Sequence, residues 1–145
     1  MEREICQWVW KNLDQTAHIP EKYLEHCDII CDEIGNIEVK EDYQACQTEN
    51  YAIEFENYKG EPSGLGITKA TYYVLVDDEV VCMLKTDDLK EIISNYKYKK
   101  IIPMGDERTN GEKCKGWLIP RELIINNSTT KVIPRWFSNW GGKGA

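Results

Sequence analysis

Residues 27–42 read CDIICDEIGNIEVKED, and this stretch decides the fold that we expect for the chain. Two short strand-like runs, 27–32 and 37–40, lie on either side of residues 33–36, whose Gly and Asn are typical of a turn. This arrangement predicts a β-hairpin. The run IEVK then lies directly beside the run CDIIC.

Alternation along the predicted hairpin gathers charged side chains on one face. Glu38 and Lys40 point to one side of their strand and Val39 to the other, and Asp28 on the neighbouring strand comes within reach of both charges. The carboxylates of Asp28 and Glu38 and the backbone carbonyl of Val39 are hard oxygen ligands, suited to Mg²⁺ or Mn²⁺. Lys40 can orient or deprotonate a water molecule and offset developing negative charge. The stretch predicts metal-dependent phosphodiester hydrolysis; the alternative is that Glu38 and Lys40 form an ordinary solvated pair on an exposed sheet face.

The rest of the chain predicts further helices and strands around this hairpin. We expect an amphipathic helix over residues 2–13 and a second helix from about Asp87 to Tyr96, with Thr86 as its N-cap. Alternating or β-rich runs predict strands at residues 51–58, 71–76, 80–84, 100–104, 117–119 and 131–133. This order predicts an α/β fold with a central mixed β-sheet flanked by helices.

Charge is distributed unevenly along the chain. Its 145 residues suit a single domain over 1–135, followed by a Gly-rich and partly mobile tail over 136–145. The net charge of −7 argues against a uniformly basic nucleic-acid coat protein. Residues 1–96 carry 8 basic and 21 acidic side chains, whereas residues 97–145 carry 10 basic and 4 acidic ones. Nucleic-acid binding, if present, is therefore expected to depend on the last third.

Basic and aromatic residues alternate in that last third, a pattern suited to phosphate neutralisation with base stacking. The basic residues that we predict to bind nucleic acid are Lys97, Lys99, Lys100, Arg121 and Arg135. They are interleaved with Tyr96, Tyr98, Trp136 and Trp140. The alternative is a basic surface that only balances the acidic body.

The cysteines and the termini give expectations about compartment. The six cysteines are scattered, and a chain of this length does not need disulfides, so we expect free thiols. Cys27 and Cys31 beside His26 could suggest zinc, but no second ligand pair follows, and both cysteines fit buried strand positions. No run is long enough to span a membrane and the first residues do not resemble a secretory signal, so a cytoplasmic protein is expected.

Three sequence segments together resemble the PD-(D/E)XK nuclease superfamily, in particular small phage-encoded and Holliday-junction-resolvase-like members. The run CDIICDEIGNIEVKED is similar to the D…(D/E)xK signature. The run NYAIEFENYKGEPSGLGITKATYYVLV is similar to the acidic strand, Gly/Pro/Ser loop, Lys-Ala step and aromatic strand of such proteins. The run KCKGWLIPRELI resembles a strand near their end, so that the resemblance spans roughly residues 27–123.

This resemblance implies a restriction-endonuclease-like core and a set of functional residues. Asp28 and Glu38 would be metal ligands and Lys40 the catalytic lysine. Glu54 matches a further acidic position, and Lys69 matches an auxiliary basic position beside the scissile phosphate. A glutamate of the first helix, Glu4 or Glu2, would complete the site.

The function that we predict is cleavage of DNA, with RNA kept open, in the presence of Mg²⁺ or Mn²⁺. A branched or nicked duplex handled by a homodimer fits the resemblance to resolvases. A different class remains open, in which a catalytically silent nuclease-like fold acts as a nucleic-acid-binding or protein-binding anti-host factor. An acidic mimic of nucleic acid is a third possibility, which the basic last third disfavours.

Overall fold

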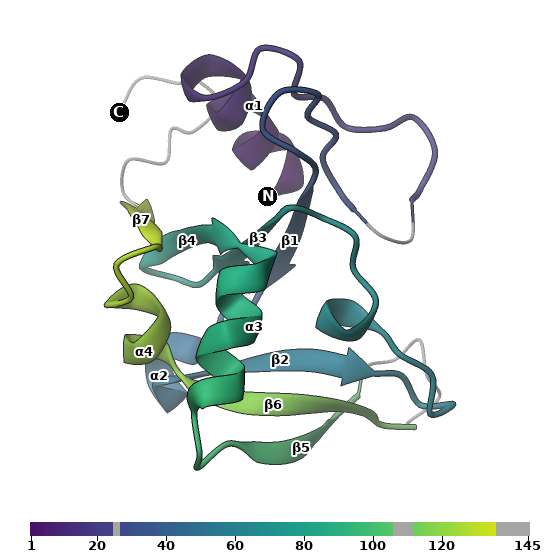
Figure 1. The fold of residues 1–145 in the computed structure, drawn as a ribbon, viewed down its shortest axis with the longest axis vertical. Helices are drawn as coiled ribbons and strands as arrows, with labels where there is room; N and C mark the ends of the chain where they lie inside the picture. The colour runs from purple at the N-terminus through teal and green to yellow at the C-terminus, as the bar shows by residue number, and fades with distance from the viewer. Residues whose placement is uncertain (25–26, 106–111, 136–145) are drawn as a thin grey trace.

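The computed structural model describes residues 1–24, 27–105 and 112–135 (Figure 1). The helices are α1 (Glu2–Asn12), α2 (Ala45–Thr48), α3 (Thr86–Asn95), α4 (Arg121–Ile125) and the 3₁₀ turn η1 (Gly64–Gly66). The strands are β1 (Ile37–Glu41), β2 (Asn50–Glu56), β3 (Tyr72–Val76), β4 (Val80–Lys85), β5 (Lys100–Met104), β6 (Cys114–Pro120) and β7 (Lys131–Pro134). The predicted α/β class is confirmed.

The strands form two sheets instead of one. A mixed four-stranded sheet has the order β1-β3-β4-β7, in which β1 and β3 are parallel and the other neighbours antiparallel. A second, antiparallel sheet has the order β2-β6-β5. The central mixed sheet was predicted, but the second sheet was not, and it is this sheet that carries Glu54.

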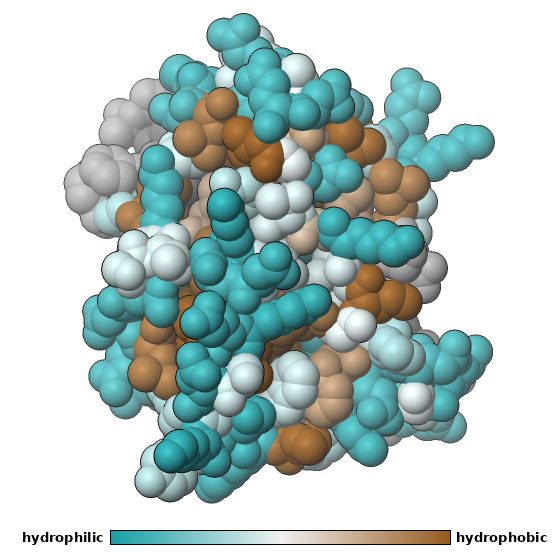
Figure 2. Space-filling model, in the orientation of Figure 1, coloured by the Kyte–Doolittle hydropathy of each residue, from teal (hydrophilic) through white to brown (hydrophobic). Residues whose placement is uncertain are grey.

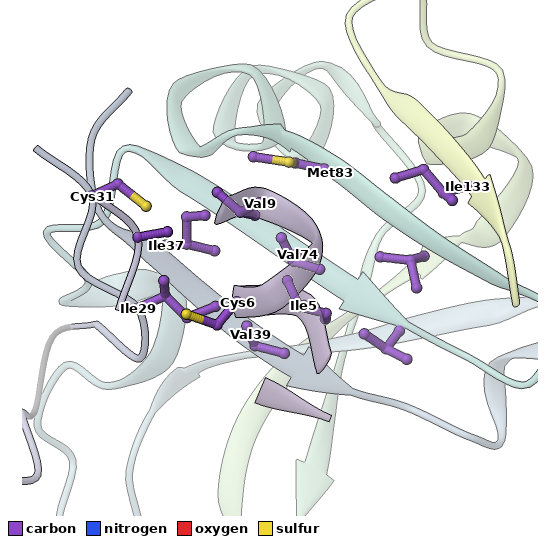
Figure 3. Close-up of a cluster of buried hydrophobic side chains, with 13 residues drawn as sticks. Ile5, Cys6, Val9, Ile29, Cys31, Ile37, Val39, Val74, Met83 and Ile133 are labelled. Carbon is purple, nitrogen blue, oxygen red and sulfur yellow. The ribbon is translucent and has the colours of Figure 1, made fainter. Parts of the chain in front are cut away.

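Helix α1 covers one face of the four-stranded sheet. Its apolar stripe of Ile5, Cys6 and Val9 packs against Val39 of β1 and Val74 of β3 (Figure 3). Ile5, Val9 and Val74 are 2% exposed or less, so this layer is closely packed. The helix predicted over residues 2–13 is thus confirmed, and it lies on the face opposite to Glu38, because Val39 and Glu38 alternate along the strand.

The second core lies between the two sheets. Tyr73 and Leu75 of β3, which point away from α1, pack with Tyr51 and Ile53 of β2. Leu89 of α3 closes the same cluster, in which all five side chains are at most 2% exposed. Residues of β1 on this face, Glu38 among them, therefore lie at the border between an apolar core and solvent.

The predicted hairpin around residues 33–36 forms only in part. Ile29 pairs with Ile37 as a single antiparallel bridge, and the backbone N–H of Asp28 donates to the carbonyl of Ile37 at 2.8 Å. The segment before the turn is not a regular strand, because Ile30 bridges to His18 instead. The prediction of two paired strands was wrong in that respect, yet the segment still runs alongside β1.

Several local predictions can be compared directly with the structure. The β3–β4 hairpin is confirmed, and none of the six cysteines forms a disulfide; Cys27 and Cys31 are buried. Thr86 is not the N-cap of α3: it is the first helical residue, and its hydroxyl donates to the carbonyl of Ala70 at 2.7 Å. Within the described ranges, no helix is long and apolar enough to cross a membrane. The predicted tail over 136–145 lies outside the described residues.

Candidate active site

Asp28 is fixed to strand β1 by hydrogen bonds on both sides of Glu38. Its backbone N–H bonds to the carbonyl of Ile37, and its side-chain Oδ2 accepts the N–H of Val39 at 2.7 Å. β1 is the edge strand of its sheet, so the N–H of Val39 needs a partner outside the sheet, and the Asp28 carboxylate provides it. The juxtaposition of Asp28 and Glu38 that the sequence predicted is therefore present.

Glu38 is a buried carboxylate that is only half satisfied. The residue is 7% exposed, and its Oε1 lies 3.2 Å from Nζ of Lys40, whose own side chain is 43% exposed. Its Oε2 is buried and has no hydrogen-bond partner. Burial raises the pKa of Glu38; Lys40 acts against this shift, and the negative charge of Asp28 adds to it. A buried polar atom without a partner is costly, and such atoms are uncommon in folded proteins, so this carboxylate is a candidate for a functional group.

Tyr73 connects Glu38 to the second sheet. In the parallel register of β1 and β3, Tyr73 lies opposite Glu38, and it is 1% exposed. Burial raises the pKa of the Tyr73 hydroxyl, and the charges of Glu38, Glu54 and Asp28 raise it further. The phenol thus lies in the field of all three carboxylates. Glu54 of β2 and Glu38 of β1 therefore both act on the Tyr73 hydroxyl, although they are in different sheets.

The first turn of α1 approaches the same edge of β1. Glu2 and Glu4 both line an open hollow of about 790 Å³ together with Val39 and Lys40. Partial burial raises the pKa of Glu2, and the charge of Asp28 adds to this shift, so Glu2 is the helix glutamate that is coupled to the site. Glu4, which was named first in the prediction, lies further along the helix; both glutamates are exposed on the surface of α1.

Lys69 stands apart from this group in the described part of the molecule. It is exposed in the segment between η1 and β3, where its neighbour Ala70 is held by Thr68 and Thr86. None of the ion pairs between described residues joins Lys69 to Glu38 or Glu54. Its auxiliary role beside a phosphate stays a prediction.

Two of the predicted nucleic-acid-binding residues are engaged inside the fold. Arg121 donates from Nε to Oδ2 of the buried Asp77 at 2.8 Å. Arg135 donates from its guanidinium to the backbone carbonyl of Asp77 at 3.1 Å and lies over the ring of Tyr43. Both guanidinium groups therefore join elements of the fold to the turn after β3. This structural role was not visible from the sequence, and binding of nucleic acid by these two arginines stays a prediction.

The other three predicted residues lie on the surface just after α3. Lys97 and Lys100 are exposed, and Lys99 is half-buried, with its Nζ donating to the carbonyl of Tyr96 at 3.3 Å. The rings of Tyr96 and Tyr98 pack edge to face, and Tyr98 is 79% exposed. An exposed aromatic ring among ammonium groups remains compatible with the predicted role.

The carboxylates give a small set of metal ligands. Across residues 1–24, 27–105 and 112–135, no three His, Cys, Asp or Glu side chains are grouped as a metal-binding cluster. Asp28 and Glu38 therefore form a two-carboxylate set, to which the carbonyl of Val39 could add a third oxygen. Two carboxylates with substrate phosphates and water are the usual ligands of Mg²⁺, so the donor chemistry fits a divalent cation, and the unpartnered Oε2 of Glu38 supports that fit.

Sequence reasoning missed Tyr73, and for the helix glutamate it preferred Glu4 to Glu2. Tyr73 could have been found from alternation along residues 72–76 only if the register with β1 had been known. Glu2 is distinguished by its electrostatic coupling to Asp28 and Glu38, which depends on how α1 packs on β1 and which periodicity alone does not provide.

Comparisons with known proteins give little support for any family. No protein-family model matches the chain. A stretch of 71 residues is 38% identical to leucine–tRNA ligases of Borrelia duttonii and Borrelia recurrentis and 37% identical to that of Borrelia turicatae. The match covers 48% of this chain but 8% of each ligase. The chain therefore corresponds to a small fraction of those proteins.

Proposed function

We propose that this protein is a divalent-metal-dependent nuclease of the PD-(D/E)XK type, with a restriction-endonuclease-like core, acting on DNA. The observation that carries the proposal is the buried, unpartnered Oε2 of Glu38, next to Asp28 on one side and Lys40 on the other. Two carboxylates and one ammonium on a single strand edge are the groups that phosphodiester hydrolysis requires.

Each residue of the site has a distinct role in this proposal. Asp28 and Glu38, with the Val39 carbonyl, would hold Mg²⁺ or Mn²⁺ at the edge of β1. When bound, such an ion polarises the phosphoryl group and lowers the pKa of bound water. Lys40, on the same face as Glu38 and partly exposed, is placed to orient the attacking water and to neutralise charge on the phosphate. Glu2 is placed to contribute a further acidic oxygen from α1.

Cleavage assays with matched variants test this proposal. The wild-type protein is incubated with plasmid, single-stranded DNA, branched DNA and RNA in Mg²⁺ or Mn²⁺. Glu38→Gln and Lys40→Met are expected to lower the rate at least 100-fold, since removal of a single electrostatic group commonly costs that much. Glu33→Gln, an exposed acid of the same segment, serves as the control that keeps activity. Absence of cleavage by wild type, or full activity of Glu38→Gln, contradicts the proposal.

RNA belongs in the substrate panel for a specific reason. The partial similarity is to ligases whose name includes tRNA, and it covers nearly half of this chain. This favours testing tRNA-like RNA beside DNA. Because the match is a small fraction of the ligase, it does not suggest that aminoacylation is carried out here.

A second function from a different class is favoured by one observation. Among the described residues no cluster of three metal-ligating side chains is found, which suits a silent nuclease-like fold that binds nucleic acid or a host protein without cleaving. Mn²⁺ distinguishes the two possibilities. In the nuclease, Mn²⁺ raises the melting temperature of wild type, and Asp28→Asn abolishes the rise, whereas a silent fold shows no shift with either protein. Sedimentation with and without branched DNA tests the proposed homodimer.

A further inference from the structure

Helix α3 separates two hollows that differ in charge. Asp88, Glu91 and Asn95 line one of them, which has a volume of about 380 Å³. Lys90, Ile93 and Ser94, which share the adjacent face because they are three and four residues apart, line the other, of about 300 Å³. Figure 2 shows the mostly hydrophilic surface of this region, with hydrophobic side chains between the polar ones. We call the second hollow the basic hollow.

The walls of the basic hollow are apolar and partly aromatic. Leu65 of η1 and Ile93 of α3 form its floor, with 2% and 3% of their surfaces exposed. Trp117 of β6 forms a side wall, and its indole stacks on Phe55 with the ring centroids 4.0 Å apart. The stack holds the indole in one orientation. A rigid aromatic wall over an apolar floor suits a flat, aromatic ligand.

The rim of the basic hollow is cationic. Lys90 of α3 and Lys99 of the segment after α3 both line the hollow, and Nζ of Lys99 donates to the carbonyl of Tyr96. In the described part of the chain, neither lysine forms an ion pair with a carboxylate. The neighbouring Lys97 and the exposed Tyr98 extend the same surface. A ligand that combines a flat ring with negative charge would therefore satisfy both the walls and the rim.

The turn η1 connects this hollow to the candidate active site. Gly64 packs directly on β2: a Cβ at this position would lie 2.5 Å from the carbonyl oxygen of Glu54. The next two residues, Leu65 and Gly66, line the basic hollow. The three-residue turn η1 therefore packs against β2 at Glu54 and also lines the hollow.

We propose that the basic hollow binds one unstacked base of a single-stranded nucleic acid, with the adjacent phosphates held by Lys90 and Lys99. The proposal rests on the proposed function for its choice of ligand and adds the place where the strand is held. The base stacks beside Trp117 over Leu65 and Ile93, and the strand continues past η1, which packs on β2 at Glu54.

Binding without metal tests this proposal independently of cleavage. Anisotropy of a labelled short oligodeoxythymidylate is measured in EDTA over a series of salt concentrations. In Lys90→Gln/Lys99→Gln, affinity falls and the slope of log K against log salt becomes shallower by about 0.7 for each lost phosphate contact. Trp117→Leu weakens binding by roughly 5- to 150-fold, the range measured for loss of one stacked base. Lys11→Gln, which removes a lysine from α1, leaves affinity and slope unchanged.

Three comparisons identify the ligand chemistry. An abasic strand of equal length is expected to bind wild type more weakly than oligodeoxythymidylate, and its affinity is expected to be unchanged by Trp117→Leu. Equal affinity of wild type for the two strands overturns the proposal. Thymidine monophosphate competes poorly, and competition as strong as that of the strand overturns it in favour of a free-nucleotide site. Poly-glutamate also fails to displace the strand, and displacement at equal charge concentration overturns it in favour of an acidic protein partner.

A second variant and a comparison with cleavage keep the binding test conclusive if Trp117→Leu fails to fold. If Trp117→Leu loses its folded circular dichroism spectrum, Ser94→Glu replaces it, because this exposed rim residue adds a repelling charge without touching the core. Unchanged affinity in the lysine double variant and in Ser94→Glu overturns the proposal even if Mn²⁺-dependent cleavage is found. Binding with the expected pattern in a protein that never cleaves supports the basic hollow and contradicts the nuclease.

Discussion

Asp77 and Glu38 are two buried carboxylates on paired strands, and their surroundings are opposite. Asp77, which follows β3, is fully buried and has donors on both oxygens. Its Oδ2 accepts from Tyr51 at 2.5 Å and from Arg121 at 2.8 Å, and its Oδ1 accepts two backbone N–H groups at 2.8 Å. Glu38 in β1 has one ion pair and one oxygen without any partner.

The same contrast appears in the titration of the two groups. Burial raises the pKa of Asp77, but the hydrogen bonds from Arg121 and Tyr51 outweigh burial and lower it to about 2. At Glu38 burial outweighs the single lysine, and the pKa is raised. Two carboxylates of similar burial are thus set apart by their partners alone. The fully paired one holds elements of the fold together, and the half-paired one keeps an oxygen without a hydrogen-bond partner.

The largest expected effect comes from removing the paired carboxylate. Asp77→Ala leaves the Arg121 guanidinium and the Tyr51 hydroxyl buried without their partner, and we expect it to lower the free energy of unfolding by about 3–5 kcal/mol. The melting temperature should fall by roughly 10 °C. Urea unfolding measures the change. Asp78→Ala, at the exposed neighbouring position, is the control and should stay within about 0.5 kcal/mol of wild type. Equal midpoints for the two variants would mean that Asp77 has no special structural role.

Acid should lower the stability of the protein by protonating Asp77. The pKa of Asp77 is about 2 in the folded protein and 3.8 ordinarily, so its contribution to stability is complete above pH 3.8 and is lost as the pH falls toward 2. Between pH 5 and 2, the urea midpoint of Asp77→Asn is therefore expected to fall less steeply than that of wild type. Parallel curves for the two proteins would contradict the lowered pKa.

Replacing Glu38, the half-paired carboxylate, should change the stability in the direction opposite to that expected for Asp77. Because the pKa of Glu38 is raised by folding, its ionised form is penalised above that pKa, and the penalty vanishes below the ordinary value of 4.5. Glu38→Gln is therefore expected to stabilise the metal-free protein by about 1 kcal/mol at neutral pH and to have no such effect near pH 4. Melting in EDTA at both pH values measures the difference. Destabilisation at neutral pH would show that Glu38 serves the fold as Asp77 does.

Much of the Glu38 region could be predicted because it depends on short-range patterns. Strand alternation places Glu38 and Lys40 on one face, and the turn at residues 33–36 returns Asp28 to the edge of β1; both are present. The burial of Glu38 was not predictable in this way. It depends on the pairing of β1 with β3, which places the buried Tyr73 opposite Glu38 and which no local pattern specifies.

The Asp77 region shows why the rest could not be predicted. Tyr51 and Arg121 are separated from Asp77 by 26 and 44 residues, and no local periodicity connects them. In sequence, Arg121 belongs to a basic segment and was interpreted as part of a phosphate-binding surface. In the fold, the start of α4 brings it to the turn after β3. A basic residue in a basic segment can therefore serve either the surface or the interior, and only the tertiary contacts decide.

The smallest expected effect separates Glu2 from Glu4. Both glutamates lie in the first turn of α1 and gain from its dipole, so replacing either one by glutamine removes a similar stabilisation. Asp28 repels Glu2, and removing that repulsion should make Glu2→Gln more stable than Glu4→Gln by a few tenths of a kcal/mol in EDTA. In saturating Mn²⁺, Glu2→Gln should become the less stable of the two variants, because Glu2 then faces a cation together with Asp28 and Glu38. Equal melting temperatures for both variants in EDTA and in Mn²⁺ would place the helix glutamates outside the site and leave β1 alone as its framework.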